Sequence, residues 1–571
     1  MYHINKTCTG CHVCRLACPM QAIHFNGSVC EIDEDGCVEC GLCEKLCPAY
    51  SVHDTDDISA PQPHDRIFRE CDLVVCGGGS GLVTAVRAGQ LGKKVILLEK
   101  SGRVGGNMNL SKVFLPEYSR LHSELGLEDI RESAIAELNV RAGGIASEET
   151  IRTAVNGAAE FSDWLLEFPG IKSKVALEEP GGSSVSGPAM IPETDLARLI
   201  FGPPVRIENK LSKDPAIGPG WLGSLIKQTM LEAIPAQRLN VEILVEHEAV
   251  HLITGSAGEV KGVVAKDPGG ETEIHCNAVV MATGGFGASD EKLQKYFGCS
   301  CIEGGLFRYT VPGNTGGAID MLRELGVEPD PARMNISALG PAHVPFSYSL
   351  RRILDHPSAL AVNLYGKRWT DESITITEKA VNIQGSPGEV SWGIFTQKNI
   401  DDIMQAYLGG LTPGDEYDCC AFYQEDLDNE ECYIEPPVYR ADSIRELAEK
   451  IGVNPVALEQ TAADYNRFCQ NSLDEEFGKS ACDLIPLEQG PFYALYGQMY
   501  AARYAGGLMV DSKCRVLRNN NSVIRGLYAC GDATSAMQRR GEPSVVPELT
   551  WALASAYRCA IEYVTDEEGS V

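Results

Sequence analysis

The sequence predicts an α/β fold built on a parallel sheet, preceded by a small cysteine-rich α+β domain. Two observations predict it: an apolar–glycine–helix–apolar pattern over residues 72–99, and a cysteine motif that occurs twice within residues 8–48. In the first pattern, residues 73–75 and 95–98 are apolar runs of strand length, and residues 80–91 between them have helical apolar spacing. Strand, tight turn, helix and strand within about thirty residues are typical of a dinucleotide-binding βαβ unit.

The turn of this unit suits a nucleotide. Its glycines let the backbone approach a pyrophosphate, whose negative charge is favoured at a helix N-terminus. Glu99, at the end of the second strand, is placed to accept hydrogen bonds from a ribose. Cys76 replaces the first glycine of G-x-G-x-x-G, so the fingerprint is a variant, and a turn without a ligand is the alternative. The turn residues expected to contact the nucleotide are Gly77, Gly78, Gly79, Ser80 and Gly81.

Three further stretches extend this pattern. Lys100–Asn107 is glycine-rich, whereas Val279–Phe286 and Gly526–Ala533 are apolar strands that run into small residues. The three stretches resemble the FAD-binding segments of flavoproteins, and this implies a Rossmann-like FAD-binding domain. An NAD-binding Rossmann domain is the alternative. The implied FAD contacts are Lys100, Gly105, Gly106, Asn107, Thr283, Gly284, Gly531 and Asp532, the last of these to the ribityl hydroxyls.

A cysteine motif occurs twice near the N-terminus. Both copies, Cys8–Pro19 and Cys37–Pro48, read C-x2-C-x2-C-x3-C-P, which resembles the bacterial two-cluster ferredoxins. In that fold, each 4Fe–4S cluster is held by three thiolates of one run and the fourth cysteine of the other. Disulfides are disfavoured in a reducing compartment, and zinc sites rarely use this spacing twice. The implied ligands are Cys8, Cys11, Cys14 and Cys47 for one cluster, and Cys37, Cys40, Cys43 and Cys18 for the other.

Length and charge narrow the class of protein. A chain of 571 residues can build roughly three or four domains with sizeable cores. Its formal net charge of −30 disfavours nucleic acid and anionic membranes as partners. We see neither a signal peptide at Met1 nor an apolar run long enough to span a bilayer, so we expect a cytoplasmic protein. The 22 cysteines favour a strongly reducing compartment, and those outside the duplicated motif are expected to be small buried hydrophobes.

Several motifs lie in the second half of the chain. They are Val311–Ala318, Ala361–Glu372, Gly490–Ala494, Gly506–Asp511, Val523–Ala529 and Ser544–Ala556. Together they resemble the flavoprotein family of fumarate reductase, succinate dehydrogenase, urocanate reductase and 3-ketosteroid Δ1-dehydrogenase. The last segment is similar to the family's final helix, whose N-terminus faces the flavin and stabilises its anionic reduced form. This adds Val545 and Val546 to the expected FAD contacts.

The resemblance implies a domain organisation. Residues 1–56 form a ferredoxin-like α+β domain with two clusters, and residues 57–69 form a linker. Residues 70–294 and 481–571 form the two parts of the Rossmann-like FAD-binding domain. Residues 295–480 form an inserted α+β capping domain that covers the substrate.

The resemblance also implies a reaction. In this family a hydride passes between flavin N5 and one carbon of a C–C bond beside an electron-withdrawing group, and the other carbon exchanges a proton. Fumarate reductases use an Arg proton donor and a His before a Gly-Gly pair. Here Ile394–Lys398 contains no Arg, and Arg503 replaces the His, which counts against fumarate or succinate. Ketosteroid enzymes hold a carbonyl with a Tyr hydroxyl and a Gly amide, which Tyr493 and Gly497 match loosely.

The candidate catalytic residues each have a structural alternative. Glu372 is expected either to relay a proton or to form a salt bridge with Arg368. Arg503 either polarises the substrate or makes a structural ion pair, and Tyr504 either donates a proton or packs. The full set of candidates is Glu372, Tyr493, Arg503, Tyr504 and Arg540.

The expected protein is an iron–sulfur flavoprotein that reduces an activated C=C bond of an enoate, a cinnamate-like acid or an enone. The electrons come from an external low-potential donor, such as a ferredoxin, a flavodoxin or a partner subunit. The reverse dehydrogenation and a pure electron-transfer role are alternatives, although the inserted cap favours an enclosed substrate site. An NAD(P)H-dependent oxidoreductase would need a second nucleotide-binding unit, and the only one found ends at Glu99.

Overall fold

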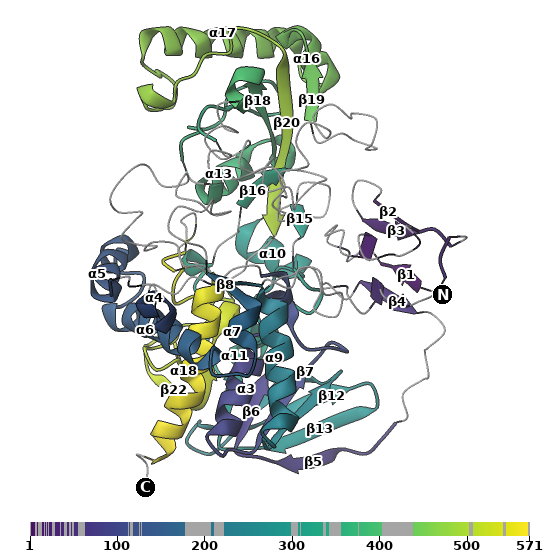
Figure 1. Cartoon of the computed structure of the whole chain (residues 1–571), viewed down its shortest axis with the longest axis vertical. Helices are drawn as coiled ribbons and strands as arrows, with labels where there is room; N and C mark the ends of the chain where they lie inside the picture. The colour runs from purple at the N-terminus through teal and green to yellow at the C-terminus, as the bar shows by residue number, and fades with distance from the viewer. Residues whose placement is uncertain are drawn as a thin grey trace.

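The computed structural model divides into a Rossmann-like domain, a cap above it and a small N-terminal domain at the side (Figure 1). The residues it describes are 2–5, 8, 14–15, 18, 20, 22–25, 29–34, 36–38, 41, 43–44, 47, 51–54, 63–111, 114, 118–124, 126, 128–177, 207–209, 222–298, 306–308, 310–334, 338–341, 354, 356–374, 376–401, 438–501, 506–538, 540, 544–546 and 548–568.

The Rossmann-like domain is built on a sheet whose central strands are apolar on both faces. The strands from β10 to β22 are parallel, and β21 adds an antiparallel edge. Every residue of β6, β7 and β14 is buried, as expected for a parallel sheet covered by helices. In spatial order the strands are β10 (Val241–Val245), β7 (Val95–Glu99), β6 (Leu73–Cys76), β14 (Ala278–Met281), β22 (Val523–Ala529) and β21 (Arg515–Leu517).

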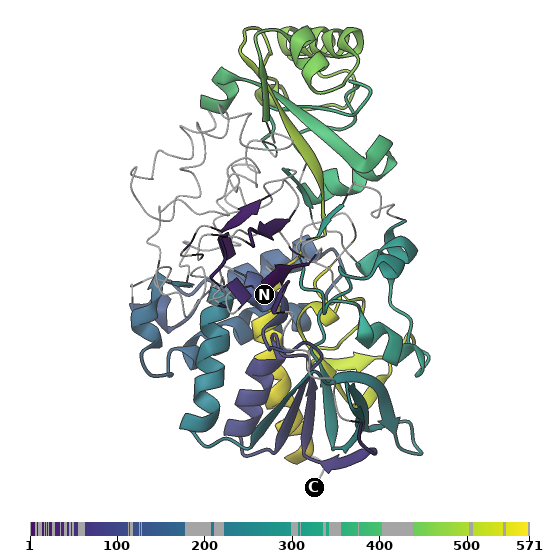
Figure 2. The ribbon, with the colours of Figure 1, turned by 90° about the vertical axis from the view of Figure 1, so that its right-hand side faces the viewer.

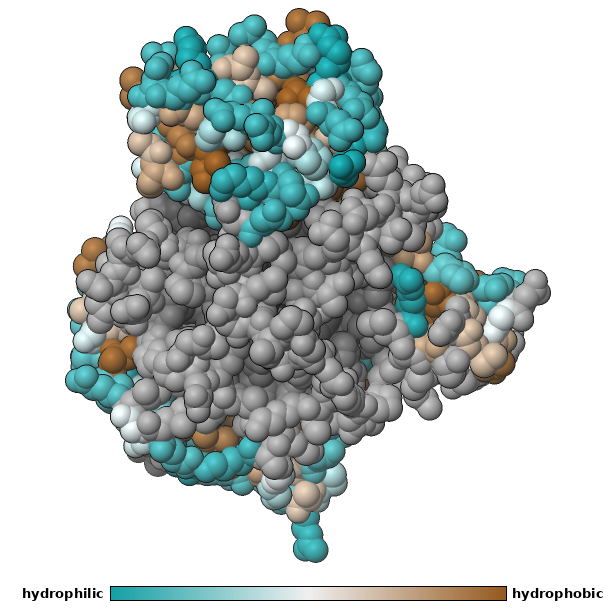
Figure 3. Space-filling view, turned by 45° about the horizontal axis from the view of Figure 1, so that its top comes forward, coloured by the Kyte–Doolittle hydropathy of each residue, from teal (hydrophilic) through white to brown (hydrophobic). Residues whose placement is uncertain are grey.

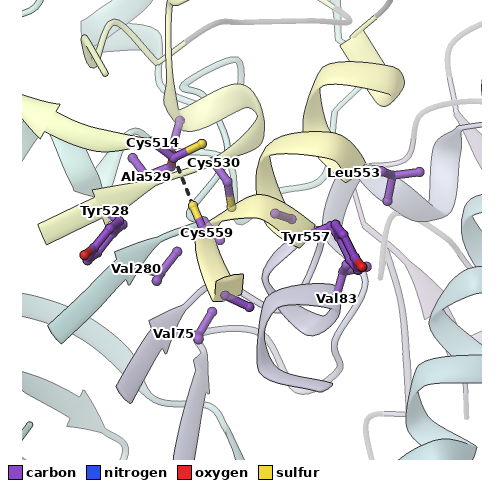
Figure 4. Close-up of a cluster of buried hydrophobic side chains, with 14 of the residues drawn as sticks. Val75, Val83, Val280, Cys514, Tyr528, Ala529, Cys530, Leu553, Tyr557 and Cys559 are labelled. Atoms are coloured by element: carbon purple, nitrogen blue, oxygen red, sulfur yellow. Dashed lines mark hydrogen bonds between the residues drawn. The ribbon is translucent and has the colours of Figure 1, made fainter. Parts of the chain in front are cut away.

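Helices cover this sheet, and α18 packs along α3 and α6 (Figure 1). Buried thiols fill part of the core between α18 and the sheet: Cys514, Cys530 and Cys559 are at most 1% exposed and lie near Val280 and Ala529 (Figure 4). For these three, the expectation of small buried hydrophobes is confirmed. Among the described helices, none is both long enough and apolar enough to cross a bilayer. The helices are α3 (Gly81–Gln90), α4 (Arg120–Glu124), α5 (Arg131–Ala142), α6 (Glu148–Leu165), α7 (Ile171–Lys174), α9 (Leu222–Ala236) and α18 (Glu548–Glu568).

A second, four-stranded sheet lies below the first. It consists of β11 (Glu248–Thr254), β12 (Val260–Asp267), β13 (Gly270–His275) and β5 (Ile67–Glu70). The sequence placed β5 in the linker at 57–69, but the strand pairs in parallel with β13. His64 reinforces this pairing, because its Nε2 lies 2.9 Å from Asp267 Oδ1. The end of the predicted linker is therefore part of the sheet.

The cap is organised around one long strand, β20 (Phe492–Ala501), which pairs with four of its neighbours. Helices α16 and α17 form its far end, and their outer surface is mainly hydrophilic (Figures 1 and 3). The other cap elements are β15 (Leu306–Arg308), β16 (Ala338–Pro341), β17 (Leu360–Val362), β18 (Val390–Thr396), β19 (Val438–Ala441), α13 (Ile376–Asn382), α16 (Ile444–Lys450) and α17 (Pro455–Asn471), with α10 (Asp290–Phe297) and α11 (Gly317–Arg323) leading into them.

The position of β20 corrects a predicted domain boundary. The sequence assigned residues 481–571 to the second part of the Rossmann-like domain, but β20 is the central strand of the cap sheet. Its run of apolar residues is buried in the cap core beside Leu360 and Ile394. The described chain therefore returns to the Rossmann-like domain only after Ala501.

The described part of the N-terminal domain contains two short antiparallel pairs around a cysteine-lined core. Its strands are β1 (Tyr2–Ile4), β2 (Ile23–Phe25), β3 (Cys30–Ile32) and β4 (Val52–Asp54). Figures 1 and 2 both place these strands at the level where the Rossmann-like domain meets the cap.

Candidate functional site

The turn between β6 and α3 is tightly packed. Gly77 has φ +110°, and a Cβ there would lie 2.2 Å from the carbonyl oxygen of Ala282, at the end of β14. The Gly78 amide donates to Glu99 Oε2 at 2.9 Å, and the Ser101 amide donates to Glu99 Oε1 at 2.8 Å. Glu99 therefore ties the turn to the end of β7, where the sequence predicts a ribose.

The N-terminus of α3 is open to an anion. Its N-cap residue, Ser80, makes no capping hydrogen bond through its side chain with the residues that the structure describes, and the first turn contains no acid. Amide groups at such a helix end attract a phosphate through their partial positive charge.

The segment at 100–107 contacts both this turn and the loop at 310–311. The Gly105 amide donates to the carbonyl of Gly78 at 2.8 Å. Asn107, in the short helix η1 (Gly106–Leu110), accepts from the Val311 amide at 2.9 Å and donates to Thr310 Oγ1 at 3.1 Å. This brings the predicted FAD segment at 100–107 into contact with the motif at 311–318.

Two hydroxyl groups at the site are buried without a partner in the described part of the chain. They belong to Thr283, a predicted FAD contact, and to Ser535. A buried hydroxyl is costly to leave unpaired, so a ligand that bonds to these groups would be favoured. Lys100 lies nearby and donates from Nζ to Thr315 Oγ1 at 2.7 Å. Burial lowers the pKa of Lys100.

The FAD segment predicted at 531–532 lies beside the same turn, because the sulfur of Cys530 is 3.7 Å from Ser80 Oγ. Gly531 and Asp532 form the short helix η9 (Gly531–Ala533), held by a hydrogen bond from the Gly531 amide to Ser555 Oγ at 3.0 Å. Val545 and Val546 are buried just before α18. That helix begins at Glu548, whose acidic side chain partly neutralises the positive potential at the N-terminus of the helix. Together these residues fit FAD: an open helix end for the pyrophosphate, Glu99 for the ribose and unpaired hydroxyls nearby.

Gly77→Ala is expected to weaken FAD binding by about tenfold or more. An alanine at this φ is strained by about 1–3 kcal/mol, and its Cβ would clash with the Ala282 carbonyl 2.2 Å away. Flavin content per purified chain, read from its absorbance, measures the effect. Gly92→Ala is the matched control, because Gly92 also has positive φ (+86°) but a Cβ there meets nothing within 4 Å. Equal flavin loss in both variants would show that strain, and not the clash, decides binding.

The cysteines of the duplicated motif fit an iron–sulfur site. The backbone amides of Cys30, Ala22 and Ser51 donate to the sulfurs of Cys8, Cys18 and Cys47 at 3.4, 3.4 and 3.2 Å. In iron–sulfur proteins, such N–H···S bonds to the ligand sulfurs help to set the reduction potential of the cluster. The motif cysteines within the described residues are Cys8, Cys14, Cys18, Cys37, Cys43 and Cys47, whereas Cys11 and Cys40 lie outside those residues.

Glu372 lies in a buried network of charges in the cap. Arg368 donates to both of its oxygens, at 2.8 and 2.7 Å, and also donates to Asp474 Oδ1 at 2.8 Å. Lys479 Nζ lies 3.2 Å from Glu372 Oε2, and all four side chains are at most 1% exposed. The salt bridge to Arg368, which the sequence left as the alternative, is therefore what the structure contains.

The electrostatics of this network favour the charged form of Glu372. Burial opposes ionisation of the carboxyl, but the charges of Lys479 and Arg368 outweigh burial and hold its pKa below the usual value. The pKa of Asp474 is lowered to about 2, because hydrogen bonds from Arg368 and the backbone outweigh the effect of burial. A carboxylate held in this way is poorly suited to donate a proton.

Tyr493 lies on β20 in the cap sheet, and its catalytic role stays a prediction. Its hydroxyl donates to Gln397, and its ring is 2% exposed within the cap sheet. From Tyr493, β20 runs on to Ala501, a length of about 26 Å at roughly 3.3 Å per residue. It is the Ala501 end that pairs with Arg308, close in sequence to Thr310 and hence to the FAD segment. The FYA motif that suggested Tyr493 is thus a structural part of the cap.

Arg540 packs against α10. Its Nη1 donates to the carbonyl of Tyr296 at 3.1 Å, and its guanidinium lies 5.0 Å from the centre of the Phe297 ring. Arg503 and Tyr504 lie outside the described residues, so their roles stay predictions. On either side of them, Ala501 pairs with Arg308, and the Gly506 amide donates to the Asp532 carbonyl.

Sequence reasoning missed several residues of the site and of the cap network. Asn314 and Thr310 hydrogen-bond to each other at 2.9 Å beside the FAD segment, and the motif at 311–318 could have indicated Asn314. Asp474 and Lys479 are more than 100 positions away from Arg368 and carry no local signal.

Family models match both parts of the chain. One described as "FAD binding domain" matches residues 72–543, and one described as "4Fe-4S dicluster domain" matches residues 7–50.

Individual proteins are similar over most of the chain. The fumarate reductase (cytochrome) of Shewanella frigidimarina is 24% identical, over 84% of this chain and 74% of its own length. The 3-oxosteroid 1-dehydrogenase of Mycolicibacterium smegmatis is 25% identical, over 88% of this chain and 99% of its own. The crystal structure of 3-ketosteroid-Δ4-(5α)-dehydrogenase from Rhodococcus jostii RHA1 aligns with TM-score 0.61 and 20% identity, over 88% of this chain and 99% of that one. The predicted α/β fold class is confirmed.

Proposed function

Because the chain belongs to the FAD binding domain family, we propose that it is an iron–sulfur flavoprotein that oxidises or reduces a CH–CH group of a small organic molecule. The observation that carries the proposal is the convergence of three segments, 99–107, 283–284 and 531–532, on the turn at 77–81. Relatives named for fumarate and for 3-oxosteroids support the reaction class.

In this proposal, different groups of the chain bind FAD, activate the substrate and exclude water. The N-terminus of α3 binds the pyrophosphate, and Glu99 binds the ribose. FAD, when bound, supplies a site that accepts and donates a hydride. Arg503 follows the end of β20 and polarises the electron-withdrawing group or donates the proton. The cap excludes water from the reacting atoms.

We further propose that the reaction runs as the reduction of an activated C=C bond. Two 4Fe–4S clusters would receive electrons singly from a low-potential donor, such as a ferredoxin, a flavodoxin or a partner subunit. The substrate classes that we favour are enoates, cinnamate-like acids and enones. The absence of Arg from Ile394–Lys398 counts against fumarate itself. We place the reaction in a reducing cytoplasm, because the chain carries 22 cysteines.

The proposed reaction is tested by measuring flavin reoxidation under anaerobic conditions. The purified holoprotein is reduced with dithionite, and the reoxidation of its flavin is followed by absorbance as enoates, cinnamates and enone steroids are added one at a time. Reoxidation by one of these classes, with formation of the saturated product, is the expected result. If none of them reoxidises the flavin and only a protein partner does, the chain is an electron-transfer protein without its own substrate.

A further inference from the structure

A hydrogen bond joins the N-terminal domain to the FAD-binding segment. Arg103 Nη1 donates to the backbone carbonyl of Glu44 at 2.6 Å. Arg103 lies in the glycine-rich segment after β7, and Glu44 lies in the second cysteine run. The donor is a charged guanidinium, which makes stronger hydrogen bonds than a neutral group does.

On the N-terminal side, this bond reaches the turn that carries cluster ligands. The Cys47 amide donates to the carbonyls of Cys43 at 3.0 Å and of Glu44 at 3.3 Å, so Arg103 and Cys47 share one acceptor. Both cysteines are buried, at 8% exposure. In the proposed ligation, Cys43 binds one cluster and Cys47 binds the other. Arg103 therefore contacts the turn that would supply one ligand to each cluster.

On the FAD side, Arg103 is two residues away from a direct contact with the flavin-binding turn. Two residues later, the Gly105 amide donates to the Gly78 carbonyl at 2.8 Å. Val104 lies between them, and its side chain is so close that a Cβ on Gly78 would meet Val104 Cγ1 at 2.7 Å. Two peptide units span at most about 7 Å, so the route from the cysteine turn to the FAD turn is short.

The charges at this junction are suited to anionic clusters. Lys227, on α9, lies near Arg103: burial lowers its pKa, and the charge of Arg103 lowers it further. Among the described residues, no carboxylate lies within ion-pair distance of Lys227. Clusters held by thiolates carry net negative charge, and a nearby cation makes them easier to reduce.

We propose that Arg103 is a positioning residue for electron transfer, which holds the cysteine turn at 43–47 against the FAD-binding turn and raises the reduction potential of the adjacent clusters. The inference rests on the proposed cofactors. With clusters and FAD bound, single electrons would pass from the clusters to the flavin, and two would be needed for every C=C bond that is reduced. Arg103 is not consumed in this step and exchanges no proton.

The first test measures the contact in the full-length holoprotein. In Arg103→Ala, hydrogen–deuterium exchange of peptides that cover residues 41–47 and 101–106 should become about tenfold faster, which corresponds to the loss of one charge-assisted hydrogen bond. Arg152→Ala is the matched control, because it removes an arginine that pairs with Glu132 and Glu148 on the surface of the Rossmann-like domain. Unchanged exchange in both peptides would overturn the proposal.

The second test separates a docking role from a merely structural one. With iron and flavin contents equal to those of the wild type, laser-flash reduction of the clusters should be followed by electron transfer to FAD that is about tenfold slower in Arg103→Ala, because the docked population falls by that factor. Cluster potentials, titrated by EPR, should shift to lower values in Arg103→Ala and stay near wild type in Arg103→Lys, which keeps the charge. An unchanged rate together with unchanged potentials would overturn the proposal.

Neither test uses an organic substrate, so both remain decisive if the proposed C=C reduction fails. If the wild-type protein contains no iron, the proposed cofactors are wrong, and the exchange measurement alone then decides whether Arg103 joins the two domains.

Discussion

Glu372→Ala is expected to lower the free energy of unfolding of the cap by about 3–5 kcal/mol, because it leaves Arg368 and Lys479 buried with too little negative charge. Asp474 would remain as the only carboxylate within the buried part of the described network. Urea unfolding followed by far-UV circular dichroism measures the loss. If Glu372 instead relays a proton, as the sequence also allows, Glu372→Ala should keep its stability and lose turnover.

An exposed ion pair in the same domain supplies the control. Arg445 and Glu459 join α16 to α17, with side chains 53% and 39% exposed. Glu459→Ala should cost less than about 1 kcal/mol, because water screens and solvates the pair. If Glu372→Ala proves as mild as Glu459→Ala, the buried network does not hold the cap together.

Arg503→Ala is expected to lower turnover by about 10²–10⁴-fold, the usual contribution of a positioned proton donor or acceptor, while FAD and iron contents stay at wild-type values. The measurement is the steady-state rate with whichever substrate reoxidises the flavin in the anaerobic screen. Arg503→Lys should recover part of the rate if charge alone matters, and little of it if the planar guanidinium is needed.

Tyr493→Phe is the matched control for this variant. It removes only a hydroxyl that donates to Gln397, at the end of β20 far from Ala501, so turnover should stay within about twofold of wild type. If Tyr493→Phe loses as much turnover as Arg503→Ala, the Tyr493 hydroxyl acts in catalysis.

Local chemistry made much of this protein predictable. The Gly77–Gly81 turn and the two cysteine runs would bind their ligands through groups that lie close together in sequence, so their spacing and its resemblance to known motifs indicated them. The order of strand, helix and strand around Glu99 followed for the same reason.

Contacts between distant segments were not predictable in this way. Arg368 donates to Asp474, which is 106 positions away, and no sequence pattern near either residue predicts this pairing. The place of Tyr493 in the cap sheet was not predicted, because a short motif records similarity along the chain but not position in space. The place of β20 in the cap sheet depends on strand partners that come from four separate parts of the chain.

The pairing of β5 with β13 has a consequence for how the protein responds to dilution. Because that pairing and the bond of His64 fix the chain from residue 63 onward, the stretch from Asp54 to Pro63 can extend by no more than about 32 Å. A tether of this length gives the two modules a mutual effective concentration in the millimolar range. Electron delivery inside the chain should therefore be first order, and its rate constant should not change as the protein is diluted.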